Sequence, residues 1–160
     1  MQKITVLCIG KLKETFYIDA AKEYEKRLKK YCKLEILELP EQKLPESPSS
    51  AELQQALLKE AFAIEEKLPK NALIIAMCIE GELLSSQSLA QSMQHFAANG
   101  HSHLIFLIGG SYGLHSSIKE KAHCRLSMSP MTFPHHLARV MLLEQIYRAY
   151  QIENGSRYHK

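Results

Sequence analysis

The strongest constraint on the fold is an uninterrupted apolar run, Leu104–Ile108, which ends at Gly109 and Gly110. The run has the length and composition of a strand, and no polar residue alternates within it. Such a strand is typically buried on both faces, as in a parallel sheet covered by helices. Gly113 follows soon after, and glycines beyond a strand allow a sharp turn and the close approach of a ligand.

Strand-like and helix-like segments alternate along the whole chain. We predict strands over residues 3–9, 34–39, 72–79, 104–108 and 124–127, and helices over 13–31, 49–68, 85–99, 117–120 and 135–152. The alternation predicts a single α/β domain, residues 1–160, with a mostly parallel sheet and helices on both faces. Ser49 with Glu52, and Ser117 with Glu120, have the spacing of helix capping boxes. In the first helix, Phe16, Ala20, Tyr24 and Leu28 are expected to face the core.

The last predicted helix is apolar on more than one side. Its apolar residues are Leu137, Val140, Met141, Leu143, Ile146, Tyr147 and Tyr150. A helix of this kind needs cover on several sides, which we interpret as a sign of a homodimer interface.

Composition favours a soluble cytoplasmic protein. Charged residues make up 23% of the chain, and no apolar stretch has membrane-spanning length or resembles a signal-peptide core. The four cysteines form no Cys-x-x-Cys pair, so we expect reduced thiols and no zinc site. The pair His101 and His103 is poor evidence for a metal, and no metal is expected.

The residues themselves leave several kinds of function open. The glycine cluster lacks the Gly-x-Gly-x-x-Gly spacing, which disfavours a dinucleotide site, but a nucleotide-binding oxidoreductase stays an alternative. A non-catalytic module that binds RNA or ribosomes is another. The segment Lys22–Lys33 carries six cations against two carboxylates; a solvated face is the first interpretation, and contact with RNA phosphates is the second.

A second loop, Leu126–Pro134, follows the next predicted strand and contains small, apolar and proline residues. Two loops suited to a ligand thus follow two successive strands. The segments Ile108–His115 and Leu126–His135, then Arg139 with Val140, and finally Tyr158–Lys160, together resemble the ribosomal RNA large subunit methyltransferase H family. That family is a minimal branch of the SPOUT class, and the resemblance extends from Ile9 to the last residue.

The resemblance implies a fold with a C-terminal trefoil knot and a homodimeric enzyme. It also implies S-adenosylmethionine as the methyl donor and N3 of a pseudouridine in the 23S rRNA of the ribosome as the acceptor. The cofactor pocket would be lined by Met77, Gly109, Met128, Ser129, Pro130, Met131, Thr132 and Phe133.

Four residues are candidates for catalysis. His135 is the first choice for the base that removes the N3 proton. Arg139 could hold a phosphate or the cofactor carboxylate, and its alternative role is a salt bridge with Glu144. A short polar tail is typically disordered, but in the related proteins it is implicated in the neighbouring subunit's site, where Tyr158 and His159 would contact the target base.

Overall fold

The computed structural model describes residues 1–160 and contains five strands that alternate with five helices. In chain order they are β1 (Lys3–Ile9), α1 (Thr15–Leu28), β2 (Lys33–Leu39), α2 (Ser50–Lys67), β3 (Leu73–Leu83), α3 (Ser86–Ala98), β4 (His103–Ile108), α4 (Ser116–Lys121), β5 (Cys124–Ser127) and α5 (His135–Glu153). All strands are parallel and form one sheet in the order β2-β1-β4-β3-β5. The predicted α/β class with a parallel sheet is confirmed. The trefoil knot stays a prediction.

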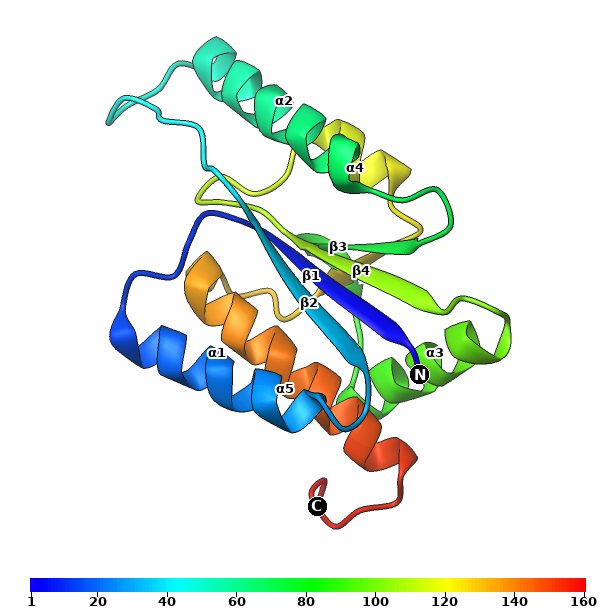
Figure 1. Ribbon diagram of the computed structural model, residues 1–160. Helices are drawn as coiled ribbons and strands as arrows, with labels where there is room; N and C mark the ends of the chain where they lie inside the picture. Colours follow the sequence, from blue (N-terminus) through cyan, green and yellow to red (C-terminus); the bar gives the residue numbers. More distant parts are fainter.

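Helices cover both faces of the sheet, with α1, α3 and α5 on one side and α2 and α4 on the other (Figure 1). Alternate residues of β1 divide between two cores: Val6 belongs to the core under α1, α3 and α5, and Leu7 to the core under α2 and α4. The central strand β4 is buried along Leu104–Ile108, as its apolar run predicts. Each such side chain stabilises the fold by about 1.5–3 kcal/mol.

Helix α5 lies between α1 and α3 and packs against the same face of the sheet (Figure 1). Leu142, Leu143 and Ile146 are completely buried within this one chain. Burial within one chain therefore accounts for one side of α5, while Leu137, Val140, Met141 and Tyr147 stay only half-buried, and the homodimer remains a prediction. No helix, α5 included, is both long and apolar enough to cross a membrane.

Two local predictions about helices have different outcomes. The Ser49–Glu52 capping box is confirmed, since the Ser49 hydroxyl accepts from the Glu52 N–H and the Glu52 carboxylate accepts from the Ser49 N–H. The capping box at Ser117 and Glu120 is wrong. His115 caps α4 instead, because its Nδ1 atom accepts the Ser117 N–H at 3.1 Å.

The predicted core face of α1 is only partly correct. Leu28 is completely buried and Tyr24 is half-buried, but the Phe16 side chain is 65% exposed. Phe16 lies in the first turn and packs on Tyr17, with ring centroids 4.4 Å apart. Ala21 is buried instead, since the covered stripe of the helix is shifted by one residue there.

The cysteines are free thiols, and Cys8 and Cys32 belong to the core as expected. Burial raises the pKa of each of these two thiols to about 11, so both stay protonated at neutral pH. Cys78 and Cys124 are half-buried. Nowhere in the structure do three or more His, Cys, Asp or Glu side chains gather as they would around a metal ion.

Candidate active site

A cavity of about 780 Å³ lies at the carboxyl ends of β3, β4 and β5. Its walls come from residues 77–80, 108–114, 126–129 and 131–135, together with Lys119 and Ala138. The carboxyl ends of parallel strands are where open α/β sheets bind small molecules, and the volume is typical of such sites. The two loops singled out in the sequence therefore meet around one space.

Most of the residues predicted to hold the cofactor lie around this cavity. The lining includes Met77, Gly109, Met128, Ser129, Met131, Thr132 and Phe133, together with the candidate base His135. Pro130 does not line the cavity. Ser129 stabilises the loop from within, because its hydroxyl accepts the Met131 N–H at 3.0 Å.

The glycine loop after β4 is closed on itself. The Gly113 N–H donates to the Gly110 carbonyl at 3.0 Å, and Gly113 has a φ of +80°, which favours glycine. A Cβ atom on Gly109 would overlap the backbone of Gly113. Gly109→Val would therefore distort the loop itself and is not a clean probe of ligand binding.

His135 lies at the cavity wall with an imidazole nitrogen that has no partner. Its Nε2 atom is buried and forms no hydrogen bond. Burial lowers the pKa of His135 below its ordinary value of 6.5, and the nearby His136 lowers it further, against smaller opposing effects of Glu41 and Glu14. The ring is therefore neutral at pH 7, and it can offer Nε2 as a proton acceptor or hold a proton there as a donor.

Comparison with known proteins decides the family. A family model described as "Predicted SPOUT methyltransferase" matches residues 2–159. The chain belongs to the SPOUT methyltransferase family. Among solved structures, the fold is similar to that of a probable methylase family protein from Haemophilus influenzae Rd KW20, with a TM-score of 0.55. The two chains are 14% identical, and the match covers 98% of this chain and 70% of the other, so it supports the fold alone.

One wall of the methyltransferase cavity was not predicted. Met77 and Glu82 of β3 both pair with Leu126 of β5, so residues 78–81 form a bulge between them. The bulge brings Glu80 to the cavity, where it forms an ion pair with Lys119 of α4. This pair supplies the only carboxylate and the only ammonium group in the lining. The Glu80-Gly81 step at the strand end was the available sequence signal.

Arg139 does not line the cavity of this SPOUT methyltransferase. Its side chain is buried and donates to the Glu38 carboxylate at 2.8 Å and to the Gly10 carbonyl at 3.1 Å. The alternative pairing with Glu144 is wrong, because Glu144 binds Arg148. Arg139 thus ties the first turns of α5 to the ends of β1 and β2, which fixes the place of His135.

Replacing Arg139 with Met should destabilise the protein by about 3 kcal/mol, because a buried ion pair loses one member. This loss is at the lower end of the range for breaking a buried ion pair, because the Glu38 side chain is still 33% exposed to solvent. Urea unfolding should show a lower midpoint, while the slope of the unfolding free energy against urea concentration stays unchanged. Adding Glu38→Gln should recover part of the loss; an equal loss in the double variant would contradict the pairing.

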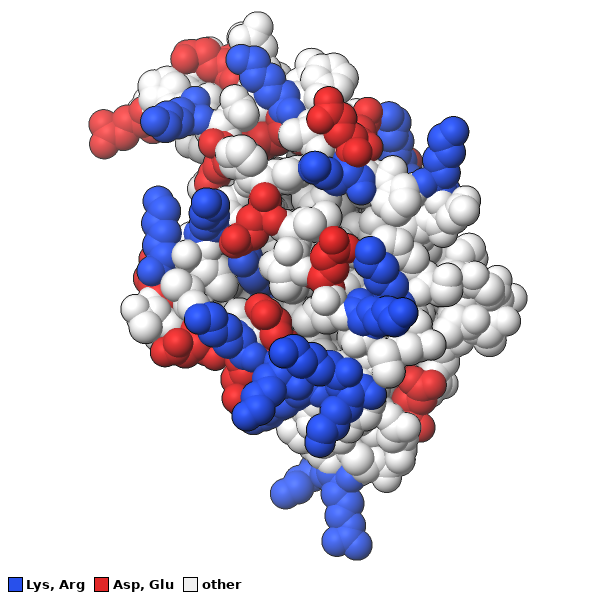
Figure 2. Space-filling view, viewed as in Figure 1, with Lys and Arg blue, Asp and Glu red and all other residues white.

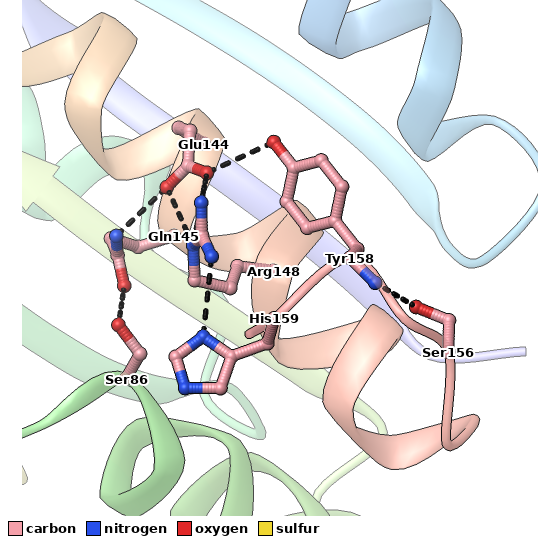
Figure 3. A network of polar contacts seen from close by, with 7 residues as sticks. All are labelled: Ser86, Glu144, Gln145, Arg148, Ser156, Tyr158 and His159. Atoms are coloured by element: carbon pink, nitrogen blue, oxygen red, sulfur yellow. Dashed lines mark hydrogen bonds and ion pairs between the residues drawn. The ribbon is translucent and has the colours of Figure 1, made fainter.

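The C-terminal tail docks on the last turns of its own α5 (Figure 3). The Tyr158 hydroxyl donates to the Glu144 carboxylate at 3.1 Å, and its ring packs edge-on against Tyr147 at 5.0 Å. His159 Nδ1 lies 3.2 Å from Arg148 Nη1. Because arginine only donates, His159 accepts through Nδ1, and its Nε2 carries the proton. The tail is therefore held in place, unlike a typical disordered terminus.

The docked tail lies far from His135 of its own subunit. His135 is in the first turn of α5 and Arg148 is near its end, so about 20 Å of helix separates them. Burial, followed by the bond to Glu144, raises the pKa of Tyr158 to about 12, so this phenol stays neutral. In this conformation, neither Tyr158 nor His159 can reach a base bound next to its own His135.

Proposed function

We propose that this chain is an S-adenosylmethionine-dependent methyltransferase that acts on N3 of a pseudouridine in 23S rRNA, as a cytoplasmic homodimer. Membership of the SPOUT methyltransferase family carries the reaction class. The observation that carries the site is His135 in the cavity lining, whose Nε2 atom is buried near Gly10 and has no hydrogen-bond partner. The acceptor follows from the sequence resemblance described above.

The cavity residues fit this cofactor. S-Adenosylmethionine supplies an electrophilic methyl group on its sulfonium. Met128, Met131 and Phe133 offer apolar surface for an adenine ring, while the closed glycine loop brings backbone groups close to it. Glu80 and Lys119 would face the charged methionine end. Together these residues would orient the bound molecule.

His135 would serve as the base. N3 of pseudouridine is a weak acid, and its proton must leave before or during methyl transfer. Nε2 of the neutral ring has no hydrogen-bond partner in the protein, and it would accept that proton once the target base reaches this buried atom. Arg139 does not touch the reacting atoms and acts as a positioning residue, since it holds the helix turn that carries His135.

Two features support a homodimer with a shared site. Three apolar side chains around the cavity are widely exposed: Ile79, Tyr112 and Met131 are 52%, 49% and 73% accessible. A second subunit would cover this apolar rim. The position of the tail also supports a shared site, because docked Tyr158 and His159 could contribute to catalysis only at the cavity of another subunit.

His135→Gln should lower the rate of methyl transfer by about 10² to 10⁴, while affinity for S-adenosylhomocysteine is preserved. In the unchanged protein, the rate should fall as pH drops below the pKa of His135, because the base is then protonated. This acid limb should begin below pH 6.5 and disappear in the variant. The control is His136→Gln, which should keep most of the activity. A retained acid limb in His135→Gln would rule out His135 as the base.

Calorimetry is the direct test of the reaction class. S-Adenosylhomocysteine should bind and NAD should not; the opposite pattern would favour the oxidoreductase. If neither binds while the protein still binds ribosomes, the chain is a non-catalytic module. Transfer of labelled methyl groups to rRNA then tests the acceptor class separately from cofactor binding.

A further inference from the structure

Five lysines near the end of α1 form a basic surface without carboxylate partners. The α1 basic surface consists of Lys22, Lys26, Lys29, Lys30 and Lys33, all of them exposed and none in an ion pair. Figure 2 shows cations gathered over this end of α1. The net charge of the segment Lys22–Lys33, with six cations against two carboxylates, is larger than the whole chain's net charge of +3. The rest of the protein is therefore slightly acidic. The positive charge is thus concentrated in one place.

This surface adjoins the docked tail. Arg27 of α1 pairs with Glu23 at 2.9 Å and also lies over the ring of Tyr147, with 5.7 Å to the centroid. Tyr147 also contacts Tyr158, with ring centroids 5.0 Å apart. The α1 basic surface and the tail therefore belong to the same end of the molecule.

The character of the surface favours a phosphate backbone as its ligand. Lysines are flexible point charges that bind phosphates without reading bases. No large apolar side chain is exposed between residues 22 and 33, whereas a surface that binds membranes inserts such side chains among the lipids. RNA is therefore the partner that this surface fits best.

We propose that the α1 basic surface binds the phosphates of the RNA substrate, and that it serves the cavity of the partner subunit. The inference rests on the methyltransferase function and the shared site proposed above. If the tail of one subunit completes the other subunit's site, the adjoining lysines come to lie beside that same site. Within one chain, Arg148, which contacts the tail, is about 20 Å of helix from His135. The lysines would supply affinity, and the cavity and the tail would supply selectivity.

The first test neutralises part of the surface with Lys22→Gln, Lys26→Gln and Lys29→Gln together. Affinity for an rRNA fragment should fall roughly a hundredfold at 0.15 M salt, and the slope of log K against log salt should become shallower by about 2 to 3. S-Adenosylhomocysteine affinity should not change. The matched control neutralises Lys59, Lys67 and Lys70, which are exposed and unpaired near α2.

The outcomes separate this inference from the proposed function. Equal RNA affinity and equal salt slopes for the two triple variants, in a protein whose parent methylates rRNA, would overturn the role of the surface. Loss of binding to anionic lipid vesicles without loss of RNA binding would overturn it as well. A parent protein that never methylates rRNA contradicts the proposed function instead.

The second test asks which subunit's lysines matter. A heterodimer is made from a chain without residues 158–160 and a chain with a filled cavity, Ala138→Trp. Its single complete site would combine the cavity of the first chain with the tail of the second. The lysine triple should lower activity at least tenfold on the Ala138→Trp chain and have little effect on the other. Equal effects, the reverse order, or an inactive heterodimer would overturn the arrangement in trans.

Discussion

Removing Tyr158, His159 and Lys160 should slow methyl transfer about a hundredfold or more, while affinity for S-adenosylhomocysteine stays the same. The expected loss corresponds to one stacking contact and one hydrogen bond to the target base, which stabilise the transition state and do not touch the cofactor. The measurements are single-turnover transfer to rRNA and calorimetry on the same preparation.

Stability provides the internal control for this deletion. Tyr158 and His159 dock on α5 through a ring contact and two hydrogen bonds at a partly exposed surface. Their loss should cost about 1 kcal/mol, or a fall in Tm of about 3 °C, more than a frayed tail would give. Tyr158→Phe removes only the bond to Glu144 and separates docking from catalysis. Full activity after the deletion would show that the tail is not part of the active site.

Mixing subunits distinguishes the two ways in which the tail could act. A tail-deleted chain and an Ala138→Trp chain are both expected to be nearly inactive as homodimers. If the tail acts in trans, their heterodimer has one complete site and recovers up to half of the normal activity per dimer. If the tail acts within its own subunit, neither site is complete. A verified heterodimer without activity would therefore contradict the shared site.

Ala138→Trp should weaken S-adenosylhomocysteine binding at least about a hundredfold, equal to roughly 3 kcal/mol. Ala138 lies on α5, is half-buried and lines the cavity, so an indole at this position would occupy the ligand's space. The change alters no backbone glycine and no residue of the main core, so it is a cleaner probe than Gly109→Val. Titration calorimetry measures the loss of affinity.

The control for this substitution is Ala97→Trp, at an exposed position in the last turn of α3. It places the same bulky group on a helix outside the cavity, and binding should stay normal. Circular dichroism and urea unfolding establish that both variants are folded. Normal binding in a folded Ala138→Trp protein would mean that the cofactor does not use this cavity.

Much of the fold could be predicted from local patterns. The run Leu104–Ile108 is apolar at every position because β4 is central and has helices on both sides. The capping box of Ser49 and Glu52 is local, since it depends on residues three apart. Both patterns can be recognised in a short stretch of sequence without knowing which distant elements pack against it.

Other features depend on partners distant in the chain. The apolar sides of α5 could indicate a second subunit or other helices of the same chain, and the pattern does not distinguish these. Arg139 pairs with Glu38, which is 101 positions away, although Glu144 is nearer in sequence. The bulge at residues 78–81 depends on how β3 meets β5. Glu80 was missed as a cavity residue for that reason.

The most direct test of the proposed function is the identification of the modified nucleoside. Ribosomes from a strain that lacks this gene are incubated with the protein and S-adenosylmethionine, and the 23S rRNA is digested and analysed by mass spectrometry. Our account predicts a new 3-methylpseudouridine, which is absent when His135→Gln replaces the parent protein. A methyl group on any other nucleoside, or no methylation by a protein that binds the cofactor, would contradict it.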